Sequence, residues 1–483
     1  MNNEKSSSSL KINMVLNAVN GFMNVIFPLI TFPYISKTLG VTEIGKVNFT
    51  NSFISYFILL AGLGINAYAI REGARIRNKS EEINKFASQV FTINILSAVS
   101  SYILLFIIVN IFDTLDSYKK SIYIYSIIIL STTIGADWIF TIYEDFLWTT
   151  IRKFVVKIVS LVLMFLFIKE PSDTIKYILI MVLADSGGYL VNIFFIPKYC
   201  KIKLTFKINF KEHIKPILIL FATAVSVTIF VNLDITLLGI LCSDEDVGIY
   251  SVSSKIYIII KTILSSVIVA AIPRLSSALD DTDNAKFEEI VNDVFKTLVT
   301  VLIPAVIGII SLRKEIILIV SNETFSKADS SLYILGISLI ASLFSWFWGQ
   351  CVLVPLRKEK IVLVSNIVSA VVNIVLNITL MPVFAGNAAA FSTLVSEIIC
   401  YIWARVIARK YIKLKNIPRF TIKILIGCVV EIIVICGLKL LVGNFLIYTV
   451  LSISFSIILY FIVEKILKNE SLGNLGNKIF NKI

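Results

Sequence analysis

The chain has 483 residues, of which 57% are hydrophobic and only 16% are charged. Soluble domains are about 45–50% apolar and about 25% charged, so this composition excludes a soluble globular enzyme and a disordered chain. The net charge of +13 does not indicate a nucleic-acid partner, because Lys and Arg accumulate on the cytoplasmic loops of membrane proteins.

A polar segment, residues 1–11, precedes a series of about fourteen apolar stretches. Each is long enough for a membrane helix, which takes ~20 residues, and none alternates as a barrel strand of ~10 residues would. The predicted spans are 12–35, 47–70, 86–112, 120–143, 152–168, 175–196, 216–241, 248–272, 294–311, 331–355, 361–383, 387–408, 420–441 and 444–464. We therefore predict an all-α polytopic membrane protein with about fourteen transmembrane helices.

The basic residues are distributed unequally between the two sets of alternate connections. Roughly three quarters of the 45 Lys and Arg residues lie on the inner side if the N-terminus is cytoplasmic, with 198–215 and 405–423 the richest segments. This asymmetry predicts a multi-pass protein of the cytoplasmic membrane with both termini in the cytoplasm.

The sequence offers no metal-binding or nucleotide-binding pattern. The six Cys residues never adopt C-x-x-C spacing, and the one His residue, His213, lies alone in a Lys-rich segment. The phosphate-binding loop G-x-x-x-x-G-K-[ST] is missing, so we do not expect ATP to drive the protein directly. We predict no catalytic residue, no metal and no cofactor.

A short internal repeat indicates duplicated halves. Residues 39–49 (LGVTEIGKVNF) and 238–250 (LGILCSDEDVGIY) each join two spans at the same place in a block of six. Many transporters consist of such halves, with the substrate site between them. The predicted organisation is a cytoplasmic N-terminal tail (1–11), an N-terminal six-helix lobe (12–200), a basic cytoplasmic linker (201–215), a C-terminal six-helix lobe (216–410), an additional transmembrane helix pair (411–465) and a cytoplasmic tail (466–483).

Several segments together resemble one family. They are YISKTLGVTEIGKVNFTNSFISYFILLAGLGINAYAIREGARIR (34–77), DWIFTIYEDF (137–146) with Arg152 after it, LDITLLGILCSDEDVGIYSVSSKI (233–256), AIPRLS (271–276) and AGNAAAFSTLVSE (385–397). The combination resembles the Wzx-type flippases, in the polysaccharide-transport branch of the multidrug/oligosaccharidyl-lipid/polysaccharide (MOP) exporters. The chain departs from that pattern at Thr141 and Ile142, where Gln-Gly is expected, and at Ile235, where a basic residue is common.

The resemblance implies twelve or fourteen helices in two pseudo-symmetric lobes around a central cavity. It implies alternating-access export of undecaprenyl-diphosphate-linked oligosaccharide repeat units across the bacterial cytoplasmic membrane, for O-antigen or capsule synthesis. The implied partners are membrane lipids, a polysaccharide polymerase, a chain-length regulator, and a proton or sodium ion that drives transport.

Ionisable residues inside the predicted spans favour a polar path through the bundle. A charge at a helix centre costs ~2.5–3.5 kcal/mol on insertion scales, so such residues face protein or water. These residues are Asp137, Asp185, Asp234, Lys255, Lys261, Glu397 and Glu431.

Amide side chains form a stripe on the first span. Asn17, Asn20 and Asn24 lie on one helical face, and Asn51 belongs to a similar polar stripe at the start of the second span. Amides can donate and accept hydrogen bonds with sugar hydroxyls, which suits a cavity lining. The alternative is that they hold spans 1 and 2 together.

Two lysines lie at different depths in the eighth span. Lys255 and Lys261 are roughly 10 and 20 Å from its expected outer end, where ammonium groups would suit a passing diphosphate. The alternative is structural pairing with carboxylates, and Asp234 lies level with Lys255. No carboxylate of the seventh span lies level with Lys261, so we expect Lys261 to be unpaired and to face a water-filled cavity.

The remaining candidates concern gating and ion coupling. Asp137 and Glu144 are seven residues apart, which predicts one shared helical face near Arg152, either as a gate or as a structural ion cluster. Asp185 and Glu397 fall near the middle of the bilayer, where a carboxyl group suits ion coupling. Arg71 matches the Arg-Glu pair of the family, which implies a role in receiving the diphosphate at the cytoplasmic mouth.

Two other function classes are considered. A polysaccharide polymerase or membrane glycosyltransferase usually needs a sizeable loop that carries its site, and the longest outer connection, 312–330, is short. A drug exporter of the same superfamily would favour acidic and aromatic cavity residues, whereas spans 1 and 8 offer amides and lysines.

Overall fold

The computed structural model describes the backbone of residues 2–280 and 284–469, and the side chain of Asn17 lies outside the described part. Every regular element in these residues is helical. The chain folds as two compact units, Met1–Gly248 and Ile249–Ile483, and each is described by itself.

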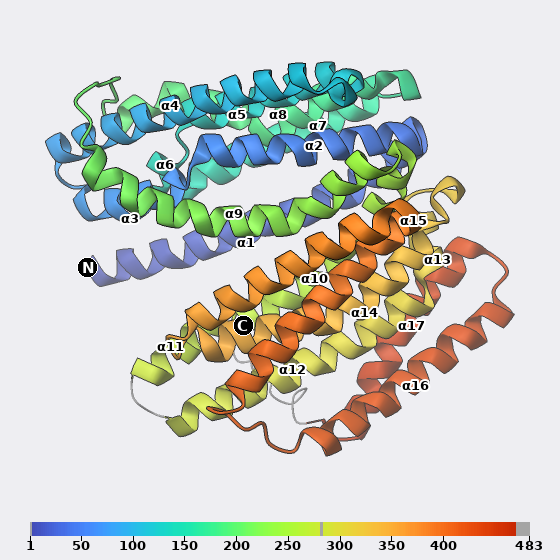
Figure 1. The fold of residues 1–483 in the computed structure, drawn as a ribbon. Helices are drawn as coiled ribbons and strands as arrows, with labels where there is room; N and C mark the ends of the chain where they lie inside the picture. The colour runs from blue at the N-terminus through green and yellow to red at the C-terminus, as the bar shows by residue number, and fades with distance from the viewer. Residues whose placement is uncertain (1, 281–283, 470–483) are drawn as a thin grey trace. The chain divides into compact units, whose positions relative to one another are not determined.

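The first unit is a bundle of long helices with several short ones at their ends (Figure 1). Its helices are α1 (Asn2–Leu39), α2 (Val41–Gly62), α3 (Ile65–Ile76), α4 (Ser80–Ile111), α5 (Lys119–Gly135), α6 (Trp138–Ile142), α7 (Phe146–Phe167), α8 (Thr174–Phe195) and α9 (Phe210–Leu241). Short 3₁₀ segments cover Asp113–Tyr118, Pro171–Asp173 and Ile196–Lys198. Helix α2 packs against α4, α5 and α9, and α7 packs against α1 and α8, so α2 forms the centre of this unit.

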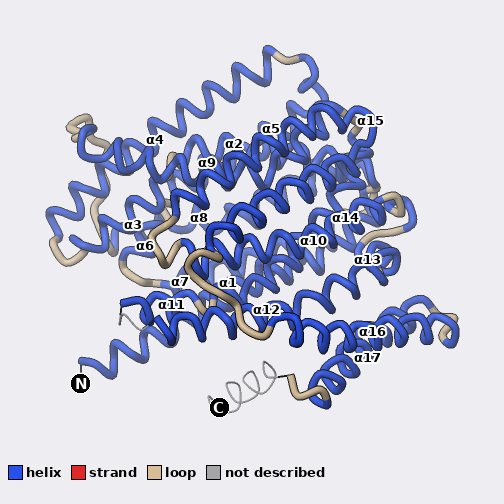
Figure 2. The backbone as a smooth tube through the Cα atoms, turned by 60° about the horizontal axis from the view of Figure 1, so that its bottom comes forward, coloured by secondary structure: helices blue, strands red, loops and turns tan. Residues whose placement is uncertain are grey.

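The second unit contains most of α10 (Asp244–Val269), whose first residues belong to the first unit. It continues with α11 (Ile272–Asp280), α12 (Asn284–Ser311), α13 (Arg313–Val320), α14 (Ala328–Phe347), α15 (Glu359–Ala408), α16 (Ile417–Leu441) and α17 (Phe445–Ile466). A 3₁₀ segment covers Glu323–Phe325, and a π-helical turn, Trp348–Leu353, follows α14. Helix α14 packs along α15, while α16 and α17 form a pair that packs against α12 (Figure 2).

Ten helical segments among the described residues are long and apolar enough to cross a membrane, so the chain is a multi-pass membrane protein. One of these segments joins stretches that the sequence separates, because α15 covers the predicted spans 361–383 and 387–408. The segment Val41–Ile76 contains α2 and α3 and covers the single predicted span 47–70. Within α15 the backbone leaves the helical region at Ala385, where φ is 45°. The count of fourteen spans stays a prediction.

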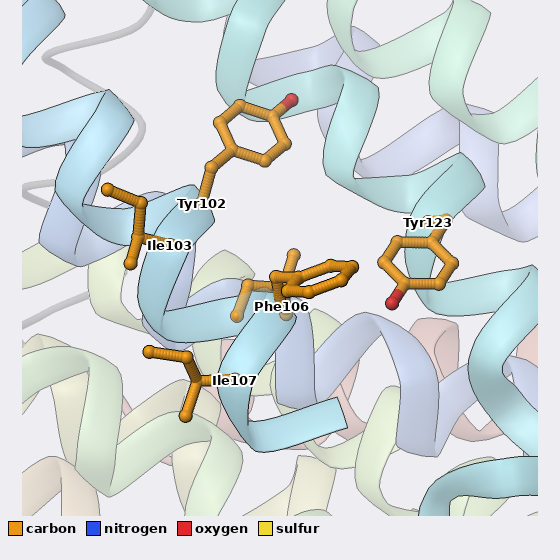
Figure 3. A pocket seen from close by; sticks show the side chains of 6 residues that line it. Tyr102, Ile103, Phe106, Ile107 and Tyr123 are labelled. Atoms are coloured by element: carbon orange, nitrogen blue, oxygen red, sulfur yellow. The ribbon is translucent and has the colours of Figure 1, made fainter. Parts of the chain in front are cut away.

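Large apolar side chains cover much of the outer surface, as expected of helices that face lipid. Figure 3 shows one hollow of about 340 Å³ in this surface. Its lining includes Tyr102, Ile103 and Phe106 of α4 and Tyr123 of α5. Ile103 and Phe106 are themselves exposed, so this hollow belongs to the apolar outer surface.

The two copies of the internal repeat touch one another through glycines. A methyl group on Gly45 would overlap the carbonyl oxygen of Asp244, and one on Gly248 would overlap the carbonyl oxygen of Val41. The contact is reciprocal, because the start of α2 lies against the glycine of α10 and the start of α10 lies against the glycine of α2. The glycines shared by the two copies therefore allow two backbones to approach closely.

Candidate functional site

Helix α7 carries three basic residues well inside its length. Asp145 caps the helix by accepting a hydrogen bond from the backbone N–H of Trp148 at 3.1 Å. The helix therefore begins at Phe146, six residues before the predicted start of the span. Arg152, Lys153 and Lys157 consequently lie on the helix and not in a loop, with Lys157 roughly 17 Å from its start.

Arg152 is the centre of a buried polar cluster. Its Nη2 atom lies 2.8 Å from Oδ1 of Asp137, and Lys153 Nζ lies 3.6 Å from the other carboxylate oxygen. Asn192 of α8 accepts a hydrogen bond from Arg152 and donates to Gly135 O at 2.8 Å. Gly188 provides the room, since a Cβ atom there would come 2.8 Å from Arg152 Nε. The cluster ties α7 and α8 to the end of α5.

The prediction that Asp137 and Glu144 share a helical face is wrong. Helix α5 ends at Gly135, Ala136 adopts φ 37°, and only the short α6 separates the two acids. Glu144, itself at φ 58°, pairs with Arg77 at 2.6 Å instead. The backbone turns between the two acids and sends their side chains to different partners.

Two amides of the predicted stripe on α1, Asn20 and Asn24, face α7. Asn20 Nδ2 donates to Thr150 Oγ1 at 2.8 Å, and Lys157 Nζ donates to Asn24 Oδ1 at 2.6 Å. Lys157 also interacts electrostatically with Asp185 of α8, whose side chain is exposed. Asn24 is exposed as well, so this face presents an ammonium group, amides and a carboxylate together.

The other first-unit candidates lie elsewhere. Arg71 is exposed on α3 and pairs with Glu72 at 2.8 Å. Asn51 is exposed on α2, and the predicted role of Asn17 falls outside the described side chains. Asp234 lies on α9 and interacts electrostatically with Tyr56 of α2.

In the second unit, Lys261 of α10 is paired, which corrects the expectation that it has no carboxylate partner. Its Nζ atom lies 3.0 Å from Oε1 of Glu397 on α15 and 5.4 Å from the centre of the Tyr257 ring. Ser342 of α14 donates to the same carboxylate oxygen at 2.8 Å. The Lys261 side chain is 27% exposed and that of Glu397 only 6%. The Lys261 side chain is therefore partly exposed, and the Glu397 side chain is buried.

A hydroxyl and amide network that was not predicted from the sequence joins the two arms of α15. Asn373 Nδ2 donates to Ser392 Oγ at 3.3 Å, and Asn377 Nδ2 donates to Asn373 Oδ1 at 3.1 Å. All three residues are buried. The four-residue spacing of the two Asn residues was the available signal, but Ser392 meets them only because the helix bends at Ala385. Lys255 also lies in this unit, half-buried on α10, and its predicted pairing with Asp234 stays a prediction.

His213 is a structural residue at the start of α9, before its apolar part. Its ring nitrogens hydrogen-bond Tyr68 Oη at 2.7 Å and Gln89 Oε1 at 2.8 Å, and only 2% of it is exposed. Burial lowers the pKa of His213. The two hydrogen bonds of His213 join α9 to Tyr68 of α3 and Gln89 of α4. Among the described residues no cluster of His, Cys, Asp and Glu is suited to hold a metal ion.

Each unit thus holds an exposed or half-exposed ammonium group on a membrane-length helix. Lys157 has amide neighbours, and Lys261 has a tyrosine ring and a buried carboxylate. Such groups can bind an anion by charge-assisted hydrogen bonds, and neighbouring amides can bind hydroxyl groups.

Comparisons with known proteins agree with this architecture. The chain matches the family described as polysaccharide biosynthesis protein over residues 10–279 and the MatE family over residues 217–379. A protein of Shigella dysenteriae named as an O-antigen transporter is 20% identical over 408 residues, which is 81% of this chain and 98% of that protein. A protein of Escherichia coli strain K12 with the same name is 22% identical over 56% of this chain, and the match spans 66% of that protein.

The fold is similar to that of a solved lipid II flippase, MurJ, in an inward closed conformation. The TM-score is 0.76 at 19% identity, covering 95% of this chain and all of the other. The resemblance to the polysaccharide-transport branch of the MOP exporters is thereby confirmed. The match over residues 10–279 covers more than half of the sequence, and the chain belongs to the polysaccharide biosynthesis protein family.

Proposed function

We propose that the chain is a flippase that moves undecaprenyl-diphosphate-linked oligosaccharide repeat units across the bacterial cytoplasmic membrane for surface polysaccharide synthesis. The observation that carries the proposal is the presence of accessible ammonium groups on membrane-length helices of both units, Lys157 and Lys261. An ionisable side chain within a membrane segment is costly and marks a substrate or ion path. The names of the relatives, which refer to O-antigen transport, support the same class.

In this proposal the diphosphate is held by basic residues and the sugars by amides. Lys261 would exchange its partner, with a phosphate oxygen replacing the Glu397 carboxylate that now lies 3.0 Å away. Lys157 would bind the diphosphate in the first unit, beside Asn20 and Asn24. Arg71, Lys255, Asn17 and Asn51 remain candidates for earlier or later contacts along the path.

The proposed transport cycle is alternating access coupled to a proton or sodium ion. Glu397 is a coupling candidate because it loses its counterion whenever Lys261 binds substrate. Asp185 is the corresponding candidate in the first unit, since it shares Lys157 with Asn24. Asp137, Glu144, Arg152 and Asp234 are proposed to gate the path rather than to bind substrate.

The proposed setting follows from the distribution of basic residues, with both termini in the cytoplasm. We propose that the lobes are 12–200 and 216–410, joined by the linker 201–215, with 411–465 as an additional helix pair. A polysaccharide polymerase and a chain-length regulator are the proposed protein partners, because the flipped repeat unit needs enzymes that use it.

A drug exporter of the same superfamily is the second candidate, and the MatE match over residues 217–379 favours it. The two classes differ in the charge of the substrate. A cationic drug would be repelled by Lys157 and Lys261, whereas a diphosphate would be attracted. Sensitivity of the deletion strain to cationic drugs, with normal surface polysaccharide, would establish the second candidate over the first.

Deletion of the gene tests the proposal. Undecaprenyl-linked repeat units should accumulate at the cytoplasmic face, and surface polysaccharide should be lost and then restored by the plasmid-borne gene. Normal surface polysaccharide in a clean deletion without a paralogue would contradict the proposal. A matched strain that produces a Lys157→Ala, Lys261→Ala double variant should remain defective if the two ammonium groups bind the substrate.

A further inference from the structure

The C-terminal helix pair encloses a cavity with a buried acid in its wall. The cavity has a volume of about 350 Å³ and lies among α12, α16 and α17, with the start of α13 at one end. Its walls are mostly aliphatic. The polar side chains in these walls include Glu431 of α16 and Ser456 and Tyr460 of α17.

Glu431 has no polar partner in the part of the chain that the structure describes. Only 5% of the residue is exposed, and its Oε2 atom is buried without a hydrogen bond. The hydroxyl group of Ser456, which is 4% exposed, is likewise buried without a hydrogen bond. Two unsatisfied polar groups in one cavity are rare in folded proteins and indicate that something small and polar binds there.

The carboxyl group points across the cavity at a glycine. A Cβ atom on Gly308 of α12 would come 3.0 Å from Glu431 Oε1, so the absence of a side chain at Gly308 keeps the acid free. Gly308 also lines the cavity. The acid therefore lies in the cavity wall, close to the α12 backbone at Gly308.

The neighbouring titratable groups offer Glu431 no positive charge. Along the cavity-lining part of α12, residues 300–312, no side chain is ionisable. Tyr460 of α17 donates its hydroxyl proton to Thr300 O at 2.7 Å, and Cys428 is on α16 itself. On α13, Glu315 is engaged with Lys439 at 3.9 Å. An anionic Glu431 would therefore be an uncompensated charge in an apolar site.

A second acid lies one helical turn away. Glu464 of α17 is fully buried, and a Cβ atom on Gly427 would come 2.8 Å from its Oε1 atom. Gly427 precedes Glu431 by four residues on α16, so Glu464 of α17 lies against α16 one turn before Glu431. Glu464 accepts a hydrogen bond from Asn469 at 2.6 Å, and Asn469 lies just beyond the end of α17. Glu464 lies outside the lining of the cavity, and it also interacts electrostatically with Lys423 of α16.

We propose that Glu431 is a proton-binding site, which exchanges its proton with water at the C-terminal end of α17 through Glu464. A proton that reaches the Glu431 carboxylate converts it into a neutral carboxylic acid, and the reverse transfer restores the carboxylate. The cavity beside it admits water or a small lipophilic molecule. This site goes beyond the proposed transport function and stands or falls independently of the transported substrate.

The test uses dicyclohexylcarbodiimide on the full-length protein in membranes, with adducts located by mass spectrometry. This apolar reagent reacts with a protonated carboxyl group: the acid proton moves to a reagent nitrogen as the carboxyl oxygen bonds to the central carbon. We expect an adduct on Glu431 whose yield falls as the pH rises. Glu397 is the matched control, because it is equally buried but has an ammonium partner at 3.0 Å, and it should remain unlabelled.

Variants and infrared spectroscopy complete the test. Gly308→Leu should fill the cavity and reduce labelling at least tenfold, while the carboxylic acid C=O band of Glu431 persists. If Gly308→Leu fails to fold, the smaller substitution Gly308→Ala takes its place. Glu431→Gln should remove that band, and Glu464→Gln should slow its disappearance after a rise in pH. An unlabelled Glu431, or a C=O band and labelling yield that do not change with pH, would overturn the proposal.

Discussion

Removing Lys261 should destabilise the protein more than removing the charge of Glu397. In Lys261→Ala the Glu397 carboxylate, 6% exposed, keeps the Ser342 hydroxyl at 2.8 Å as its one hydrogen-bonding partner among the described side chains. Breaking a buried pair in this way costs about 3–5 kcal/mol, and we expect about 3 kcal/mol because Lys261 is partly exposed. In Glu397→Gln the ammonium group keeps solvent and the Tyr257 ring, so the expected cost is about 1 kcal/mol.

The assay is the midpoint of thermal unfolding of the detergent-solubilised protein, followed by the loss of its monodisperse chromatographic peak. The double variant Lys261→Ala, Glu397→Gln should be more stable than Lys261→Ala alone, because it no longer contains a stranded carboxylate. Ser342→Ala serves as a control that loses one hydrogen bond and keeps the pair. Equal destabilisation by the two single variants, or no recovery in the double variant, would refute the reasoning.

Three further predictions concern packing, pH and topology. Gly45→Ala should lower the yield of folded protein, because the added methyl group overlaps the Asp244 carbonyl oxygen. The control Gly437→Ala, where a Cβ atom meets nothing within 4 Å, should leave the yield unchanged, and equal yields of the two variants would contradict the prediction. The pKa of His213 is lower in the folded protein than in the unfolded chain, so the unfolded chain binds the proton first as the pH falls. The unfolding temperature should therefore fall as the pH drops below about 6.5, and His213→Gln should make the unfolding temperature depend less on pH. Reporter fusions should indicate the outside after residues 45, 245 and 320 and the cytoplasm after 80, 205 and 415, and a reversed result at 205 would overturn the topology.

The order of the apolar segments and their helical nature follow from the sequence because membrane spans need long, continuous apolar runs. The residues at which the helices begin and end are harder to predict from the sequence. The start of α7 is set by the Asp145 cap and not by hydrophobicity, so hydrophobicity alone assigns Lys157 to the inner surface although it lies well inside the helix. Ala136 and Glu144 adopt positive φ without being glycine, and a sequence gives little sign of such turns.

The candidate residues were largely named from the sequence, but their partners were not. Lys261 and Glu397 are 136 residues apart, and no local pattern joins them. Likewise, Asn20 and Asn24 of α1 bond to α7, because the packing of helices decides which face meets which neighbour. The repeat at 39–49 and 238–250 led to the prediction of duplicated halves, which stays a prediction, and the reciprocal contact of its glycines became apparent from the structure alone.

Reconstituted transport tests the central claim most directly. The purified protein would be placed in liposomes with a fluorescent undecaprenyl-diphosphate oligosaccharide, and an impermeant reagent would measure the fraction that reaches the other leaflet. We predict faster movement than in protein-free liposomes, and a strong reduction in the Lys157→Ala, Lys261→Ala double variant when equal amounts of folded protein are compared. Movement no faster than in protein-free liposomes, together with transport of a lipophilic cation by the same preparation, would contradict the assignment as a glycan flippase.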